Sequence, residues 1–504
     1  MDNIPEKFFL KLPQPQGRFL NWPLLSNLFI TLLLAIPHLS DRDFWYDESL
    51  TGLVSQLSFS EIIKMLSSSA YLQPPLYIVM VKIFANPFGY SPIAIRGLSL
   101  VAGLFGVSGV YFLARKLFNA KVAFWAALMA ATSPFILHYA TEARSYSLAG
   151  TFVVWSAILL ARAVQKNHVI DHIGWGLMMV SAVMAHYTAL LFVPVFLFSY
   201  FAGIIYGSDS LSHGFWNIVK RIPRLILAAL VALTASAIWL APLLRHFHNR
   251  TNSWVPEIHI TEIGEILRIF LFGTVPGSIG VPPSIEFRIQ ILNDIVPYAL
   301  AIFVAGISIW LWTKFSEEKS SLAQILILAL VPLIAGYLCL IISIRILVSR
   351  FVFSASLFLY IVLGAWLVKL SWKSRIAVIA IFSILIVLRQ PVNLSHGFSQ
   401  LAANPPAGKY TLVALNPFDF SVAKYYLPQY SLGLYNISWP DEDFSGWETI
   451  KPDRRILSAD ELASYPDLLI MYNKNIPPPE GSFSVDKFQE IGRYDNLILY
   501  AVKK

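Results

Sequence analysis

The stretch AIRGLSLVAGLFGVSGVYFLARK, residues 94–116, decides the fold class. Residues 94–113 are predominantly apolar, with Arg96 near their start and the basic pair Arg115 and Lys116 just after their end. An α-helix needs about 20 predominantly apolar residues to cross a lipid bilayer. The stretch therefore predicts a membrane-spanning helix flanked by positive charge.

The composition of the whole chain agrees with this prediction. Of its 504 residues, 56% are hydrophobic and only 13% are charged, whereas a soluble globular chain carries about 25% charged residues. A soluble enzyme, a disordered chain and a fibrous protein are thereby excluded, which leaves a polytopic membrane protein. The single cysteine, Cys339, excludes an intrachain disulfide and a cysteine-based metal site.

Further apolar runs predict eleven spans in total, the first of them retained and not cleaved as a signal peptide. They lie at about residues 23–40, 94–113, 122–140, 145–161, 173–186, 188–206, 225–243, 294–313, 322–342, 351–368 and 376–389. The apolar piece 75–85 contains Lys82 and is too short to cross, so it suits an interfacial or re-entrant helix.

Positive charge decides the orientation, because cytoplasmic segments carry an excess of Lys and Arg. With residues 1–22 in the cytoplasm, Lys and Arg are more than twice as dense in the inside segments as in the outside loops before residue 389. This leaves two long outside loops, 41–93 and 244–293, and an outside segment, 391–504. The net charge of +8 then reflects orientation and is no nucleic-acid footprint.

The outside C-terminal segment, 391–504, is predicted to form a small α/β domain separate from a membrane domain at 23–390. Its expected strands are 409–415, 467–471 and 496–502, because these runs are short, apolar and bounded by turn residues. Its expected helices are 420–426 and 458–463, with Ser458 as an N-cap.

Charged residues gather at the outer ends of the spans, where they are functional hypotheses by default. The sequence DRDFWYDE, residues 41–48, follows the first span, and HYATEARSY, residues 138–146, joins the third and fourth spans through a tight turn. A solvated loop beside an aromatic belt is the alternative for the first cluster. A self-neutralising pair that ends a helical hairpin is the alternative for Glu142 and Arg144.

Other outer polar groups are weaker signals taken singly. His186 and Tyr187 lie at an outside turn, where a structural histidine is the commoner explanation. Arg96, Arg345 and Arg350 near span ends are each more typical of snorkelling anchors than of ligands. All of these clusters nevertheless fall on one side of the membrane in an orientation that other residues fixed.

This arrangement suits one type of reaction. Carboxylates can accept a proton from a nucleophilic hydroxyl, and arginines can stabilise a departing phosphate. Apolar spans beside them can hold a lipid tail, and an outer site has no ready supply of cytosolic nucleotides. A lipid-linked phosphate is therefore the activated substrate that we expect.

The motifs of this outer ring resemble those of the GT-C membrane glycosyltransferases, in particular glycosyltransferase family 39. That family includes the protein O-mannosyltransferases, and lipid A aminoarabinose transferase is a related enzyme. The resemblance covers about residues 20–370. It is carried by WYDE (45–48), QPPLY (73–77), IRGLS (95–99), YATEARSY (139–146), HYT (186–188) and SRF (349–351).

The resemblance implies an inverting transferase of the plasma (inner) membrane that uses a polyprenyl-phosphate-linked sugar. By similarity, Asp47 activates the acceptor hydroxyl, and Glu48 positions the acceptor or supports Asp47. The residues that would hold the donor phosphate are Arg96, Arg144 and Arg350. Those that would position substrates are Gln73, Glu142 (by orienting Arg144), His186 and Tyr187.

Several points stay open at this stage. Members of the family often have His where this chain has Gln73, and an amide is a poor metal ligand, so no metal residues are assigned and a divalent cation stays an open question. The acceptor is a lipid, a glycan or a protein. A lipid-linked oligosaccharide polymerase or ligase is the nearest alternative. A secondary transporter would place charges near the membrane midplane and show internal repeats, and a scaffold would not explain the ordered clusters.

Overall fold

We describe a computed structural model of the chain. It describes residues 21–67, 73–206, 208, 210–248, 262–273, 283–315, 318–339, 347–387, 396–435, 451–456, 458, 461–462, 464–465, 467–474 and 488–503. The predicted cytoplasmic segment up to residue 20, Arg345, and most of the predicted outer loop 244–293 lie outside these residues.

The chain divides into two compact units. The first, here called the bundle unit, comprises residues 1–36, 99–141 and 145–391. The second, here called the sheet unit, comprises residues 37–98, 142–144 and 392–504. The sheet unit thus combines a segment near the N-terminus with the C-terminal segment, which a division of the chain at residues 390–391 does not anticipate.

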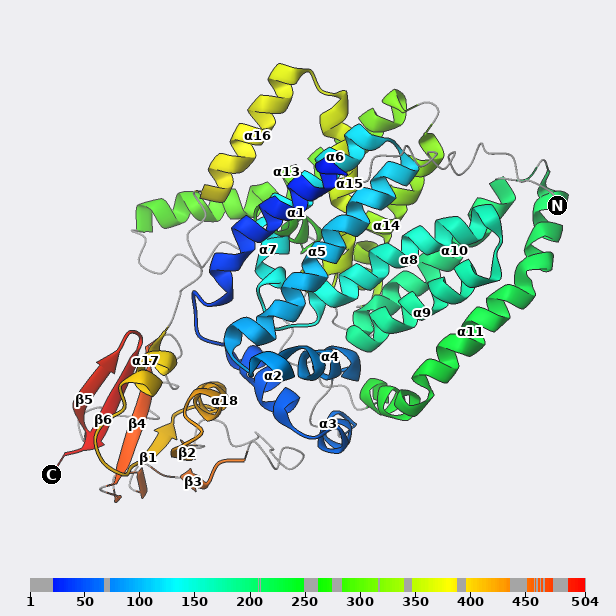
Figure 1. Cartoon of the computed structure of the whole chain (residues 1–504). Helices are drawn as coiled ribbons and strands as arrows, with labels where there is room; N and C mark the ends of the chain where they lie inside the picture. Colours follow the sequence, from blue (N-terminus) through cyan, green and yellow to red (C-terminus); the bar gives the residue numbers. More distant parts are fainter. Residues whose placement is uncertain are drawn as a thin grey trace. The chain divides into compact units, whose positions relative to one another are not determined.

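The bundle unit consists of helices (Figure 1). They are α1 (Trp22–Ala35), most of α5 (Pro92–Leu117), α6 (Ala120–Thr132), α7 (Pro134–Ala140), α8 (Tyr146–Lys166), α9 (Val169–Ala185), α10 (Phe192–Tyr206), α11 (Leu211–His248), α12 (Glu262–Phe272), α13 (Pro283–Lys314), α14 (Lys319–Leu338), α15 (Phe353–Lys369) and α16 (Trp372–Val387), with a short 3₁₀ turn at Tyr187–Leu191. A second 3₁₀ turn, Ile36–Leu39, begins at the last residue of the segment 1–36 and continues in the sheet unit. Each predicted span coincides with one of these helices or with a pair of them.

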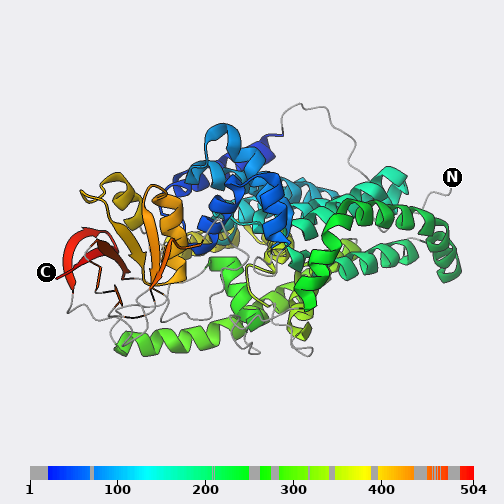
Figure 2. The same cartoon turned by 90° about the horizontal axis from the view of Figure 1, so that it is seen from below.

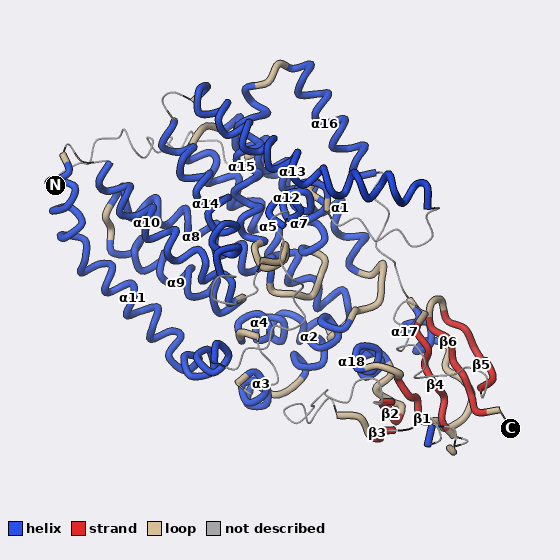
Figure 3. Tube along the Cα trace, turned by 180° about the vertical axis from the view of Figure 1, so that it is seen from behind, coloured by secondary structure: helices blue, strands red, loops and turns tan. Residues whose placement is uncertain are grey.

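Helices of the bundle unit pack closely where small residues face each other. Helix α8 packs on α9, and α6 packs on α15; Figure 3 shows α8, α9, α10 and α11 side by side. A Cβ atom on Gly364 of α15 would come within 2.5 Å of the backbone nitrogen of Ala126 in α6. Glycine at this position therefore lets the two backbones meet, as small residues do between membrane helices.

The lengths and apolar composition of the helices bear on the number of spans. Among the described residues, six helices are long and apolar enough to cross a membrane, or seven if a bent pair counts as one span. Helices α9 and α15 are shorter apolar helices. Eleven spans therefore stay a prediction. The segment predicted to be too short to cross is helix α4 (Pro75–Ala85), of 11 residues.

The predicted span 122–140 is not one straight helix. It is broken into α6 and α7, which meet at 63°. Pro134 begins α7, and the Ser133 hydroxyl accepts a hydrogen bond from the Ile136 backbone N–H at 3.3 Å, so Ser133 is its N-cap. The pair Ser-Pro is a helix-start signal, and the sequence prediction passed over it.

The sheet unit contains a six-stranded sheet and several short helices. The elements from the C-terminal segment appear in orange to red in Figure 2. Its helices are α2 (Tyr46–Gln56), α3 (Phe59–Leu66), α4, the 3₁₀ turn Asn86–Phe88, α17 (Gly397–Ala403) and α18 (Pro417–Tyr426). Its strands are β1 (Thr411–Ala414), β2 (Ser431–Tyr435), β3 (Arg454–Ile456), β4 (Leu468–Asn473), β5 (Phe488–Tyr494) and β6 (Leu497–Val502).

The strand order is β3-β2-β1-β4-β6-β5. Strands β1 to β4 pair in parallel, and β6 is antiparallel to both β4 and β5. The predicted small α/β domain is confirmed, with β1, β4 and β6 at the three predicted strands. Ser458 also accepts a hydrogen bond from the backbone N–H of Glu461, as an N-cap does.

Candidate functional site

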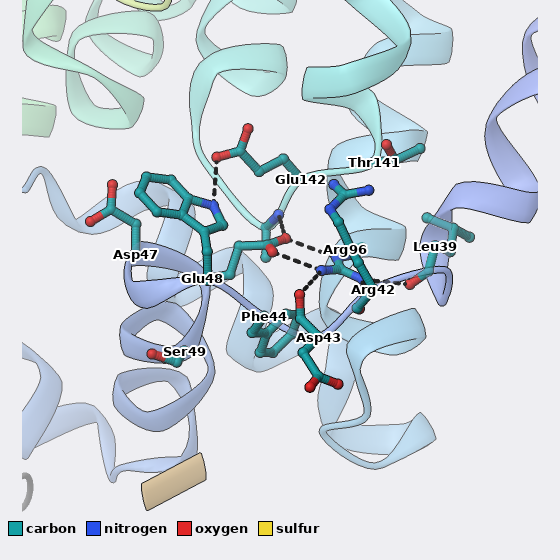
Figure 4. Close-up of polar contacts among 12 residues, drawn as sticks. Leu39, Arg42, Asp43, Phe44, Asp47, Glu48, Ser49, Arg96, Thr141 and Glu142 are labelled. Atoms are coloured by element: carbon teal, nitrogen blue, oxygen red, sulfur yellow. Dashed lines mark hydrogen bonds and ion pairs between the residues drawn. The ribbon is translucent and has the colours of Figure 1, made fainter. Parts of the chain in front are cut away.

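An ion pair between Glu48 and Arg96 lies at the centre of the polar cluster in the sheet unit. Both side chains are fully buried, and they form a two-pronged contact (Figure 4). Arg96 Nε donates to Glu48 Oε1 at 2.8 Å, and Arg96 Nη2 donates to Glu48 Oε2 at 2.7 Å. The backbone N–H of Ala143 also donates to Glu48 Oε1, at 2.7 Å. Glu48 therefore ties α2 both to α5 and to the turn at 142–144.

The remaining N–H groups of Arg96 donate to backbone carbonyls. Nη1 donates to Leu39 and Arg42 at 3.0 Å each, and Nη2 donates to Asp43 at 3.2 Å. A guanidinium has five N–H donors, so all of them have protein acceptors here. The geometry of Arg96 is that of a structural clamp, although the sequence suggested a phosphate ligand.

Asp47 occupies a different environment although it is the neighbour of Glu48. In Figure 4 the two side chains diverge, with Glu48 directed to Arg96 and Asp47 directed away from it. The Asp47 carboxylate lies 3.4 Å from Arg144 Nη2 and keeps 21% of its side-chain surface exposed. Asp47 is also in the first turn of α2, where the helix dipole stabilises negative charge.

Arg144 is nearly buried and faces two of the predicted residues. Besides Asp47, its guanidinium contacts the side-chain oxygen of Gln73 when the Gln73 amide is oriented to satisfy both groups, with Nη1 at 2.6 Å. Gln73 directly precedes the Pro74-Pro75 pair at the start of α4. The structure therefore brings Asp47, Gln73 and Arg144 together from three separate segments.

Trp45 is a member of the cluster to which the sequence prediction assigned no role. Its indole Nε1 donates to Glu142 Oε1 at 3.0 Å, while the residue as a whole is 40% exposed. Glu142 is 3% exposed. The Glu142 carboxylate thus holds the Trp45 ring, and its predicted role in orienting Arg144 stays a prediction. The Trp45-Tyr46-Asp47-Glu48 motif was a signal for this residue.

Asp43 links the same segment to the C-terminal part of the sheet unit. Its Oδ2 accepts from the backbone N–H groups of Phe398 and Ser399 at 2.9 and 3.3 Å, at the start of α17. Burial raises the pKa of the Asp43 carboxyl, and these hydrogen bonds oppose that rise.

The other three predicted site residues belong to the bundle unit. His186 Nδ1 and the Thr188 hydroxyl lie 2.8 Å apart, and the His186 ring packs on Phe351 with centroids 5.3 Å apart. Arg350, adjacent in sequence, lies over the Phe351 ring at 5.7 Å. The Tyr187 hydroxyl accepts from Trp239 Nε1 at 2.9 Å. His186 and the Arg350–Phe351 pair are thereby brought together within this unit.

The carboxylates of the cluster are mostly engaged with protein donors. Among the described residues, no three His, Cys, Asp or Glu side chains form a group that could hold one. Glu48 is occupied by Arg96 and the Ala143 N–H, and Glu142 accepts from Trp45.

Comparisons with known proteins show which proteins this chain resembles. A family model described as dolichyl-phosphate-mannose-protein mannosyltransferase matches residues 72–240. ArnT from Cupriavidus metallidurans in the apo state matches with a TM-score of 0.58 and 13% identity, over 95% of this chain and 97% of that chain. The chain therefore shares its fold with ArnT, and part of it resembles the mannosyltransferase family.

Two further structures resemble this chain. ArnT bound to undecaprenyl phosphate matches with a TM-score of 0.55 and 13% identity, over 96% of this chain and 98% of that chain. The archaeal oligosaccharyltransferase AglB from Archaeoglobus fulgidus, in complex with an inhibitory peptide and a dolichol-phosphate, matches with a TM-score of 0.52 and 12% identity, over 90% of this chain and 69% of that chain. A comparison with curated proteins gave no match.

These matches confirm the predicted GT-C fold but not the number of spans, and the apolar helices support a multi-pass membrane protein. The matched interval 72–240 includes Gln73, Arg96, Glu142 and Arg144, and it begins after Asp47.

Proposed function

We propose that this protein is a GT-C glycosyltransferase that moves a sugar from a polyprenyl-phosphate-linked donor to a hydroxyl acceptor, with inversion at the anomeric carbon, on the extracytoplasmic side of the plasma membrane. The observation that carries the proposal is the contrast between Asp47 and Glu48. The first carboxylate is partly exposed beside Arg144, and the second is locked by Arg96. Asp47 is then the base, and Glu48 is a positioning residue.

The base role follows from position and access. The Asp47 carboxylate lies 3.4 Å from Arg144 Nη2 and keeps 21% of its side-chain surface exposed, and a carboxylate within reach of a hydroxyl can accept its proton. Asp47 takes the proton from the acceptor hydroxyl as its oxygen attacks the anomeric carbon. The bond between that carbon and the phosphate oxygen breaks, and the polyprenyl phosphate leaves with the electron pair.

Arginines are suited to receive the phosphate. Arg144 presents its guanidinium next to Asp47, and a planar fork of N–H groups binds phosphate oxygens in two-pronged fashion. Arg350 is the second candidate, beside His186, in the bundle unit. Arg96 is assigned a different role from the one that the motif suggested, because its five N–H groups are engaged in holding Glu48 and the loop at 39–43.

A lipid-linked donor is supported by the similar structures. One ArnT structure was solved with undecaprenyl phosphate and one AglB structure with a dolichol-phosphate. The AglB likeness favours one second candidate, transfer of a preassembled oligosaccharide. The proposed acceptor is a lipid, a glycan or a protein that carries a hydroxyl group.

The test supplies the purified protein in detergent with two donor sets. One set consists of polyprenyl-monophosphate hexoses and pentoses, and the other of polyprenyl-diphosphate oligosaccharides. A membrane extract provides acceptors, and mass spectrometry reports the mass added. We expect the addition of one sugar from the first set only. Addition of a whole oligosaccharide would select the second candidate, and no transfer from either set would refute the proposal.

A further inference from the structure

We infer that helix α18 of the C-terminal segment contributes to catalysis, because it positions helix α2 and thereby Asp47. The inference rests on the proposed function for the role of Asp47. Ser421 and Tyr425 on α18 are the positioning residues. Neither touches the reacting groups, and both act through α2 and its neighbours.

The first contact is a buried hydrogen bond between the two helices. The hydroxyl oxygens of Ser49 and Ser421 lie 2.8 Å apart, and both residues are buried. The Ser49 hydroxyl donates to the Tyr46 carbonyl at 2.7 Å, so Ser421 is the donor to Ser49. Ser49 is two residues after Asp47 in the first turns of α2. The hydrogen bond therefore acts at the end of the helix that bears the base.

The second contact is a close approach one turn further along α2. A Cβ atom on Gly52 would lie 2.7 Å from Cε2 of the Tyr425 ring, so glycine is what lets α18 come this near. The Tyr425 ring also packs on Phe44, with centroids 4.8 Å apart. The Tyr46 and Phe418 rings meet edge to face at 5.0 Å, beside the Ser49–Ser421 hydrogen bond.

The same helix also holds the partner of Glu48. The Tyr425 hydroxyl donates to the carbonyl of Tyr90, two residues before α5 begins. Arg96 lies in the first turns of α5 and holds Glu48. Helix α18 thus contacts both elements that the Glu48–Arg96 pair joins.

The position of α18 is itself fixed by the sheet. Asn416 caps the helix by accepting from the Asp419 backbone N–H at 2.8 Å. The buried Asp419 carboxylate accepts from Asn416 and, at 2.7 Å, from Asn473 at the end of β4. Asn473 in turn accepts from Asn496 at 2.7 Å. A continuous series of contacts therefore runs from β4 through α18 to α2.

Proton transfer depends on such positioning. A misplacement of about 1 Å in a catalytic group can cost on the order of 10²-fold in rate. A positioning role for α18 therefore predicts a loss of kcat when its contacts with α2 are altered, with the apparent affinity for donor kept. A role in stability alone predicts a lower melting temperature and an unchanged kcat in the fraction that stays folded.

The experiment uses full-length protein with Ser421→Ala, Ser49→Ala, both together, and Gly52→Ala, which wedges the helices apart. Ser431→Ala, on an exposed residue of β2, is the matched control. Initial rates with polyprenyl-phosphate hexoses give kcat and the KM for donor. Hydrogen exchange of the α2 amides, on the protein without donor, reports whether the helix has loosened.

We expect Ser421→Ala to lower kcat roughly 3- to 10-fold, which is the rate ratio that corresponds to the free energy of one hydrogen bond. The KM for donor should stay unchanged, and the α2 amides should exchange faster. The double variant should be no worse than Ser49→Ala alone, because Ser49→Ala already removes the hydrogen bond to Ser421 together with the one to the Tyr46 carbonyl. Gly52→Ala should lower kcat further. Unchanged kcat and α2 exchange in both Ser421→Ala and Gly52→Ala would overturn the inference. No transfer by the wild-type protein would refute the proposed function instead, and the exchange data would still show whether α18 holds α2.

Discussion

Replacement of Arg96 by Met should lower the stability of the sheet unit, and this should be its main effect on the protein. The change leaves the Glu48 carboxylate buried without its counter-charge, and it removes donors from three backbone carbonyls. Breaking a fully buried ion pair by removing one partner typically costs about 3–5 kcal/mol. That is a large share of the roughly 5–15 kcal/mol by which a domain is stable.

The assay is thermal unfolding in detergent, followed by intrinsic fluorescence, with Arg493→Met as the matched control. Arg493 also pairs with a glutamate, Glu490, but on an exposed edge strand, where such pairs contribute little. We expect a fall in the melting temperature of order 10 °C for Arg96→Met and almost none for the control. Equal melting temperatures for both variants, or loss of donor binding by a fully stable Arg96→Met, would refute the clamp and restore Arg96 as a phosphate ligand.

Two further predictions concern phosphate binding and pH. Arg144→Lys should raise the KM for donor by roughly 10-fold or more, because a lysine cannot make the two-pronged phosphate contact of a guanidinium; donor titration against a Lys424→Arg control measures this, and an unchanged KM contradicts it. Burial raises the pKa of Asp419 to about 6. Holding this carboxylate ionised in the folded protein therefore lowers the free energy of unfolding by on the order of 3 kcal/mol above about pH 6, and this penalty is absent below about pH 4. The melting temperature should therefore rise as the pH falls from 7 to 5, and Asp419→Asn should flatten that part of the profile; the same profile in the variant would contradict the assignment.

The helical regions and part of the sheet could be predicted because their signals are local. Each apolar run is long enough to identify a helix, and β1, β4 and β6 are buried apolar strands. Strand β5, with the sequence FQEIGRY, escaped because most of its residues are exposed and polar. The break in the helix at Pro134 was not predicted, because the apolar run continues across it.

The residues of the candidate site could likewise be predicted from the sequence, whereas the contacts between them could not. Asp47, Glu48, Gln73 and Arg144 could be named from motifs that are separated in the sequence. The different environments of Asp47 and Glu48 could not, because they depend on Arg96 and on the Ala143 N–H, which only the folded chain brings to Glu48. The support from α18 was equally hidden, since it joins residues more than 370 positions apart.

The most direct test of the central claim is the rate of sugar transfer by Asp47→Asn. Asp41→Asn is the matched control, because Asp41 also pairs with an arginine and its side chain is 18% exposed, against 21% for Asp47. The isosteric change at Asp47 removes the base and leaves the Glu48–Arg96 clamp intact. We predict transfer reduced about 10²- to 10⁴-fold, with a wild-type melting temperature, and near-normal transfer by the control. Full transfer by Asp47→Asn from a purified polyprenyl-phosphate sugar would contradict the account.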